Sequence, residues 1–386
     1  MKASGQYFDL DTKHSHAASL FRMLQKGLLN TCGASHSVSL CLTAHEASKP
    51  SGQQVSDVFR VVMHHSASAP NQLVWSIKEI EFRPMDLCIT GKQQSQSKPA
   101  HLAAKGTINV RSSHPITGTS SAGSAAVQSA SLTEITNICA SIQRLNASHC
   151  GECLGYVMDS LDTQYHGLYW PTAPLVERSD VTLHSLASVF AHQKVQSHDA
   201  LTVAQGRHLA LAVSAGMLQI HDTPWLPKQW GRHEIMLPKK SGLLLAGHPF
   251  VSISTEKENA LKVNSIAPRQ YFPSCVAIKN ETVFALGRLL IELSMGSSFE
   301  ELAEPTELSA DGTKNALSDI ITAEQLLPFV YSKSGDRYGD AVRRCVRCDF
   351  DQWKNSLDDD YFKQAVYDGV VSVLEEEARM FSSSLP

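Results

Sequence analysis

The chain has 386 residues, of which 42% are hydrophobic and 19% charged, so it can bury a substantial core and is not globally disordered. Its formal net charge of −4 argues against a nucleic-acid-binding protein, because phosphate contacts require a basic surface. Nine cysteines without a short-spaced framework indicate free thiols in a reducing compartment. The N-terminus lacks the apolar core of a signal peptide, and no apolar run reaches the roughly 20 residues that span a bilayer. We therefore expect a cytoplasmic protein without a membrane span.

The N-terminal part of the chain predicts one helix followed by three strands. Apolar residues at helical spacing predict a short amphipathic helix over 16–30. Alternating apolar residues then predict strands over 36–45, 57–65 and 73–82. Segments rich in Pro, Gly and Ser separate these strands, which favours an antiparallel meander.

A change of composition marks the middle of the chain. Residues 91–131 are rich in Ser, Gln, Gly, Ala and Pro, which predicts a flexible insertion that contains at most one strand, over 106–110. A helix over 132–145 and strands over 152–158 and 165–170 are expected after it.

Everything after a proline-rich break at 171–174 is predicted to be helical. The expected helices cover 180–192, 199–220, 281–296, 322–331, 336–348 and 359–381. Residues 281–293 are apolar on all faces and too short to span a membrane, so they predict the central buried helix of a large domain. The apolar stripe from Phe362 to Phe381 is interpreted as core, with a groove for a partner helix as the alternative. The expected fold class is α+β.

Several short motifs, in this order, resemble a fungal family of unknown function that carries a degenerate protein-kinase-like domain and is seen alongside heterokaryon-incompatibility and prion-inhibition type proteins. The motifs are Cys32 with His36, and the segments 153–156, 168–169, 181–186, 207–212, 221–226, 284–287, 341–345 and 348–350. The resemblance implies a protein-kinase-like bilobal fold. Its expected parts are an N-terminal segment (1–30), a strand-rich N-terminal lobe (31–172) with the insertion 91–131, and a larger helical C-terminal lobe (173–386).

The residues that perform kinase chemistry are missing from this pattern. No G-x-G-x-x-G loop occurs among the first three strands, and no Asp-Phe-Gly follows the expected catalytic loop. In the kinase-like order of motifs that the resemblance implies, Gln229 stands at the position of the catalytic base. Glu234 stands at the position of the metal-binding Asn. Gln has no titratable carboxylate and cannot accept the substrate proton. Losing both the base and the magnesium ligand makes phosphoryl transfer improbable.

The sequence contains one candidate remnant of a kinase cleft. Lys78 stands on a strand that faintly resembles Val-Ala-Ile-Lys, and Glu134 is expected to open the following helix, so the two could pair. The simpler interpretation is a surface lysine on an alternating strand. We therefore expect no catalytic residue, and a vestigial cleft formed by Lys78, Glu134, Gln229 and Glu234.

Two groups of residues suggest other kinds of site. Two Cys-x-x-Cys pairs, Cys150 with Cys153 and Cys345 with Cys348, have the spacing of zinc ligands. Cysteines buried in the core are the more common case. A redox pair of Cys150 and Cys153 is the third interpretation. The basic cluster of 343–347 fits an anion or an acidic partner, although a salt-bridged helix face is more common.

The segment 221–230 also contains residues that suggest chemistry. His221 and Asp222 suggest catalysis, but no nucleophile elbow accompanies them. Trp225 and Trp230 are interpreted as packing anchors of their loop.

The sequence therefore predicts a catalytically inactive pseudokinase-like interaction or scaffold module that acts in fungal incompatibility-type signalling. We expect a protein partner, no metal and no cofactor, ATP included. The alternative is an atypical nucleotide-binding, kinase-like enzyme that uses Lys78.

Overall fold

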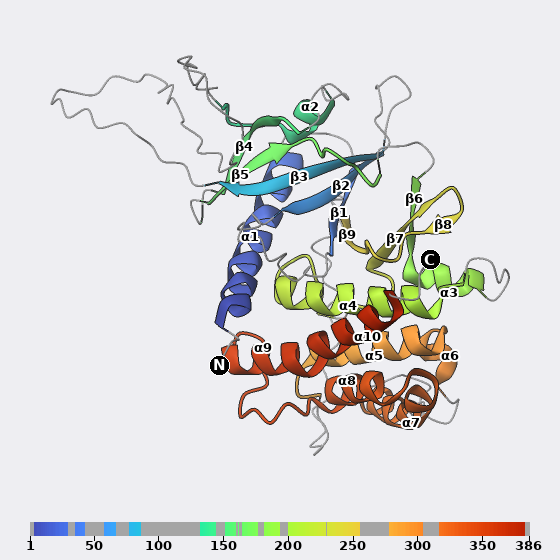
Figure 1. The fold of residues 1–386 in the computed structure, drawn as a ribbon. Helices are drawn as coiled ribbons and strands as arrows, with labels where there is room; N and C mark the ends of the chain where they lie inside the picture. The colour runs from blue at the N-terminus through green and yellow to red at the C-terminus, as the bar shows by residue number, and fades with distance from the viewer. Residues whose placement is uncertain are drawn as a thin grey trace, which may run out of the picture.

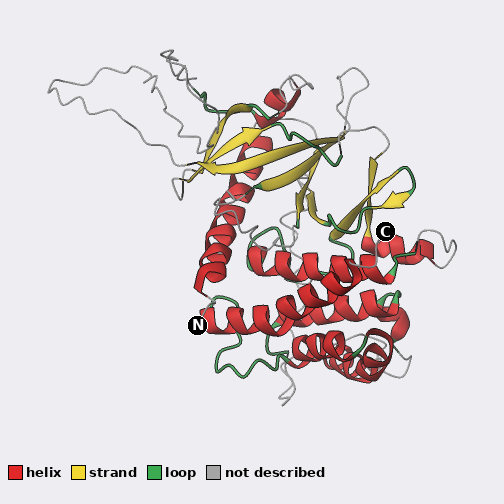
Figure 2. Cartoon of the chain, viewed as in Figure 1, coloured by secondary structure: helices red, strands yellow, loops and turns green. Residues whose placement is uncertain are grey.

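The computed structural model has an α+β fold, in which a single antiparallel sheet lies above a layer of helices and one long N-terminal helix joins the two (Figures 1 and 2). The structure describes residues 4–29, 35–42, 58–66, 77–85, 132–143, 151–159, 161, 164–176, 181–193, 200–228, 230–254, 278–303 and 316–382. The predicted insertion 91–131 lies outside these ranges. No helix in them is long and apolar enough to cross a membrane.

The sheet combines strands from both halves of the chain. Within the described ranges its strands are β1 (Ser35–Cys41), β2 (Phe59–Ser66), β3 (Ile77–Met85), β4 (Cys153–Asp159), β5 (Gln164–Tyr169), β6 (Val181–Ser185), β7 (Ile235–Lys240), β8 (Leu243–Leu244) and β9 (Phe250–Ser254). Their spatial order is β4-β5-β3-β2-β1-β9-β7-β6, with β8 paired to β7. All of these pairs are antiparallel, and the predicted meander of the first three strands is confirmed.

The expectation that everything after residue 174 is helical was wrong. The predicted helix over 180–192 begins as strand β6 and becomes helix α3 (Leu186–Gln193) only from residue 186. Strands β7, β8 and β9 lie within residues 235–254. Val181 and Thr182 are β-branched and pair with Lys240 and Lys239 of β7. Strand β9 pairs with β1, far away in the sequence, and such a partner is invisible to local periodicity.

The helices of the C-terminal part are largely as predicted. They are α4 (Val203–Ile220), α5 (Glu281–Met295), α6 (Phe299–Leu302), α7 (Ala316–Ser334), α8 (Asp336–Arg347), α9 (Asp360–Val366) and α10 (Ser372–Ser382). Asn280 caps α5, since its side chain accepts from the backbone N–H of Val283 at 2.9 Å, and Gly296 ends the helix in the left-handed region. Helix α5 buries most of its length, which confirms the predicted central helix.

The predicted helix over 359–381 contains a break in its hydrogen-bond pattern. A π-helical segment, η4 (Tyr367–Val371), separates α9 from α10. The apolar stripe is nevertheless core, as predicted: Phe362, Val366, Val370 and Leu374 are all wholly buried. A π segment inserts an extra residue into the turn, and a sequence pattern with helical spacing does not reveal it.

Helix α1 (Ser4–Leu29) is longer than the predicted short helix and runs from the helical layer up to the sheet (Figure 1). Its residues Leu20, Leu24 and Leu28 are buried in a core cluster that also contains Phe82 of β3. Helix α2 (Ile138–Gln143) packs against the upper end of α1. Gly27 faces Ile138 there, where a Cβ atom would come within 2.7 Å of the isoleucine side chain. One continuous core therefore joins the sheet to the helices through α1.

We predict that replacing Leu24 with Ala lowers the free energy of unfolding by about 2–5 kcal/mol, because it empties a buried site at which α1 meets the core. Gln25→Ala is the matched control, since the neighbouring Gln25 is exposed and its replacement should change stability by less than about 0.5 kcal/mol. Urea unfolding monitored by circular dichroism measures both. Equal effects of the two substitutions would show that α1 does not hold the core.

Candidate functional site

The structure gives Lys78 and Glu134 separate environments, in which they do not pair with each other. Lys78 lies on β3, on the same face as the buried Ile80 and Phe82, and its ammonium group stands 4.9 Å from the centre of the Trp170 ring. Glu134 does not open a helix, because α2 begins at residue 138; it forms an isolated parallel bridge to Tyr156 beside β4 and is exposed. Within the described ranges no ion pair joins Lys78 to Glu134.

The opposite face of β3 carries a buried acidic group that sequence reasoning missed. The Glu79 side chain is fully buried, and its carboxylate accepts hydrogen bonds from the backbone N–H groups of Leu175 and Val176 at 2.6 and 3.0 Å. These two residues follow β5, where the chain passes from the early strands to β6. Burial raises the pKa of Glu79, against the lowering effect of these two hydrogen bonds.

A cross-strand ion pair accompanies Glu79. Arg60 of β2 lies 3.8 Å from the Glu79 carboxylate and 3.4 Å from that of Glu81, which also accepts from Arg83 at 2.7 Å. The sequence contained a signal for this ion pair. Glu79 and Glu81 alternate with Ile80, and Arg60 alternates with apolar residues on the preceding strand, so all three charged side chains can share one face of the sheet. Recognising it required the strand register, which pairs Arg60 with Glu81.

The Glu234 side chain is hydrogen-bonded within the turn that contains it. Its carboxylate accepts from the backbone N–H of Gly231 at 2.8 Å, and its backbone carbonyl accepts from Ser252 at 3.1 Å. These contacts hold the turn that leads into β7 against β9. Gln229 lies outside the described residues, so its place relative to Glu234 and Lys78 stays a prediction.

Helix α1 holds the loop that follows α4. The indole N–H of Trp225 donates to the carbonyl of Ala17 at 2.8 Å, and Phe21 meets the Trp225 ring edge-on at 5.4 Å. A ring nitrogen of His14 donates to the carbonyl of His221 at 2.7 Å, and the two imidazoles stack at 4.5 Å. Trp225 and Trp230 are both buried, which confirms their predicted role as packing anchors.

Two histidines at this interface are buried. Burial, the neighbouring His14 and the Lys363 ammonium lower the pKa of His221 to about 4, against the raising effects of its bond to the Leu218 carbonyl and of Asp222. His166 of β5 is fully buried, with His16 of α1 edge-on at 5.3 Å. Burial and, to a lesser degree, His16 lower its pKa to about 3, while Asp159 raises it.

Cys345 and Cys348 lie in the core, in agreement with the predicted structural role. Burial raises the pKa of the Cys348 thiol to about 11 and that of Cys345 further, so both stay protonated at neutral pH. Cys153 is partly exposed, and its thiol contacts the carbonyl of Gly155 at 3.5 Å. Cys150 lies outside the described residues, which leaves the remaining thiol of the proposed set unplaced.

The basic cluster of α8 is a salt-bridged face. Arg343 pairs with Asp349 at 2.9 Å, and Arg347 makes two hydrogen bonds to Glu324 of α7, at 2.8 and 2.7 Å. These contacts are largely exposed, so each stabilises the fold by about 1 kcal/mol or less. The acids that satisfy these guanidinium groups come from the chain itself.

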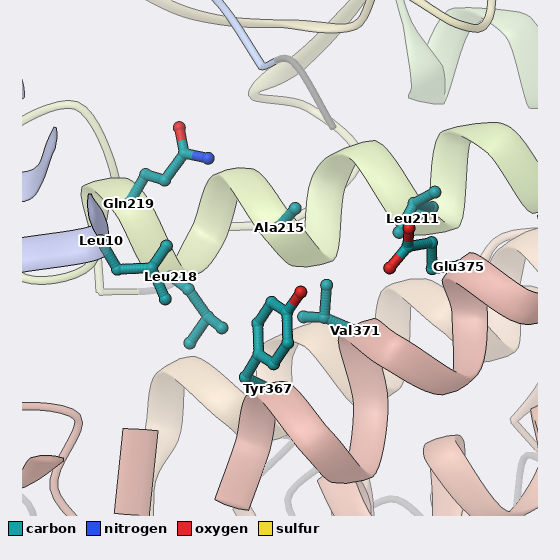
Figure 3. A pocket seen from close by; sticks show the side chains of 8 residues that line it. All are labelled: Leu10, Leu211, Ala215, Leu218, Gln219, Tyr367, Val371 and Glu375. Carbon is teal, nitrogen blue, oxygen red and sulfur yellow. The ribbon is translucent and has the colours of Figure 1, made fainter. Parts of the chain in front are cut away.

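A shallow groove lies where α1, α4, η4 and α10 meet (Figure 3). Tyr367 of the π-helical segment stands between Leu218 of α4 and Val371, while Leu10 closes one end and Glu375 lies toward the other. The groove has room for one water molecule at most. It is a packing seam between helices rather than a ligand pocket.

The buried His166 generates a pH prediction. Its folded pKa is below the unfolded value of about 6.5, so the unfolded state binds a proton more readily and stability falls as the pH drops below about 6.5. Between pH 6.5 and pH 5, protonation linked to His166 lowers the free energy of unfolding by about 2 kcal/mol. In His166→Leu, the free energy of unfolding measured by urea titration should therefore fall by about 2 kcal/mol less between the two pH values.

His64→Gln is the control, because His64 is exposed on strand β2 of the same sheet and its replacement should leave the pH dependence unchanged. The groups that face His166 are His16 and Asp159, the latter bound by Arg22 at 2.6 and 2.9 Å. An identical loss of stability in the wild type and in His166→Leu would contradict the assignment.

Comparisons with known proteins agree with a single unit that covers most of the chain. A family model described as a domain of unknown function, DUF7580, matches residues 9–381. No curated protein matches the chain. The matched segment begins within α1 and ends within α10, so it includes the sheet, the helical layer and the helix that joins them. This chain belongs to the DUF7580 family.

Proposed function

We propose that this chain is a catalytically inactive, protein-kinase-like interaction module of a fungal incompatibility-type signalling system. The proposal rests on the order of motifs that resembles the degenerate kinase-like family. In that interpretation the first five strands with α2 correspond to the small lobe, the segment after β5 to the hinge, and α4 to α10 to the large lobe.

The observation that carries the proposal is the use of Glu79. In a two-lobed arrangement, the backbone N–H groups of Leu175 and Val176 would border the cleft between the lobes. Both donate to the buried Glu79 carboxylate within 3.0 Å. A ligand would have to displace the buried Glu79 carboxyl group from these donors and leave it without both hydrogen bonds, which is strongly unfavourable.

The remaining charged groups of the vestigial cleft support the same proposal. Lys78 stands over the Trp170 ring, and the Glu234 carboxylate is hydrogen-bonded within its own turn. The loop expected to hold a catalytic base begins with His221 and Trp225, both buried against α1. Each group is therefore used for packing or local geometry, which favours a scaffold over a phosphotransferase.

A partner-binding role is supported by aromatic residues at the surface. Trp353, in the loop between α8 and α9, is wholly exposed, and Tyr361 at the start of α9 is 78% exposed. Trp and Tyr are enriched among the residues that dominate binding energy at protein interfaces. Neither side chain contributes to the core of the chain.

The proposal predicts that ATP with magnesium does not raise the melting temperature of the purified chain. A nucleotide present at 100 times its dissociation constant would stabilise the native state by about 2.7 kcal/mol, which a thermal-shift assay detects readily. We expect no shift at millimolar MgATP, and no transfer of labelled phosphate to the chain or to a generic substrate.

Lys78→Ala and Lys354→Ala separate the two functional interpretations. A shift that Lys78→Ala abolishes and Lys354→Ala preserves would support the alternative, an atypical nucleotide-binding enzyme, and would overturn the scaffold proposal. Lys354 is the control because it is 74% exposed and lies in the loop before α9.

A further inference from the structure

Three possible metal ligands converge where α4 ends and α9 begins. His221 forms the C-cap of α4, Asp222 follows it, and Asp358 precedes Asp359, the N-cap of α9. One ring nitrogen of His221 and one carboxylate oxygen of each of Asp222 and Asp358 lie within 4.8 Å of one another. Within the described ranges this is the one group of at least three such residues.

Burial and one hydrogen bond hold the His221 ring in place. Its side chain is buried, with 1% of the residue exposed, and Nδ1 lies 3.0 Å from the Leu218 carbonyl, to which it donates. That bond leaves Nε2 as the nitrogen with a free lone pair, and none of the described residues forms a hydrogen bond to it. Ligating histidines in proteins commonly donate their other ring N–H to a backbone carbonyl in this way.

The surroundings favour a cation. Asp222 and Asp358 are exposed, and no described basic side chain forms an ion pair with either. The Lys363 ammonium, which lowers the pKa of His221, is paired with Asp11 of α1, and this pairing reduces its repulsion of a bound cation. The C-terminal end of α4 adds the negative end of a helix dipole.

We infer that His221, Asp222 and Asp358 form a binding site for a divalent transition metal of the zinc class. An imidazole nitrogen with two carboxylate oxygens suits zinc better than calcium or magnesium, which prefer oxygen ligands throughout. Ligand atoms around tetrahedral zinc lie roughly 3.4 Å apart, so rotation of the two exposed aspartates brings them into range. Water would fill the fourth position.

Such a site would reinforce the contacts that α1 makes. His14 stacks on His221, and Asp11 pairs with Lys363 of α9. Metal bound to His221 and Asp358 would join the end of α4 to the start of α9, next to the residues that make these contacts. The site does not depend on the proposed function, since it uses none of Lys78, Glu134, Gln229 and Glu234.

Titration of the full chain, freed of metal with a chelator, tests the inference. Zn²⁺ should raise the melting temperature and bind at one equivalent by calorimetry, and Co²⁺ should give the visible absorption of a site with nitrogen and oxygen ligands. Asp222→Asn and Asp358→Asn should each weaken binding at least about tenfold. Mg²⁺ and Ca²⁺ should bind far more weakly than Zn²⁺.

Asp360→Asn is the matched control, because Asp360 is an exposed acid in the first turn of α9 and is not one of the three ligands. It should bind Zn²⁺ as the wild type does. The aspartate variants keep His221 in place, so the test does not depend on altering a buried residue. No binding at millimolar Zn²⁺, tighter binding of Mg²⁺, or affinity unchanged in both aspartate variants would overturn the inference.

Discussion

The structure depends on the burial of α1 between the sheet and the helices. Leu20, Leu24 and Leu28 enter the core that contains the first strands, while Leu10 and Ala17 meet the end of α4 and the loop after it. Burying a leucine side chain contributes about 1.5–3 kcal/mol, so these four buried leucines on one helix outweigh any single polar contact. Without α1, the apolar side chains of β5 and α4 that pack against it would be exposed to water.

Polar contacts decide how α1 and its neighbours are oriented. Arg22 binds Asp159 at the end of β4, and the indole of Trp225 reaches the Ala17 carbonyl. Within the helical layer, the buried Arg207 of α4 lies over the ring of Tyr338 at 4.0 Å and donates to the Ser334 carbonyl at 3.1 Å. Buried charges of this kind add little net stability, but losing one partner is costly, so they favour a single arrangement of the helices.

The same use of polar groups extends to three glutamates in different parts of the fold. Glu79, Glu234 and Glu292 each accept a backbone N–H bond, from Val176, Gly231 and Phe299 in turn. Glu292 also pairs with Arg232 at 2.6 Å, which links the turn before β7 to α5. Glu79 and Glu292 each have two or more polar partners and are structural groups, because moving either carboxylate toward a ligand would leave those partners unsatisfied.

The sequence by itself determined the local elements whose signals are contained in neighbouring residues. The spacing of apolar residues located α4, α5, α8 and the first three strands, and the absence of kinase motifs is a property of the letters alone. Only the tertiary structure decided the rest. Strand β9 exists because β1 offers a partner, β7 pairs in turn with β9, and Glu79 and Arg60 meet because of register. His221, Asp222 and Asp358 likewise converge through the packing of α9 near the end of α4. Pairing and packing between distant segments leave no periodic trace in either segment, and for that reason the sequence does not reveal them.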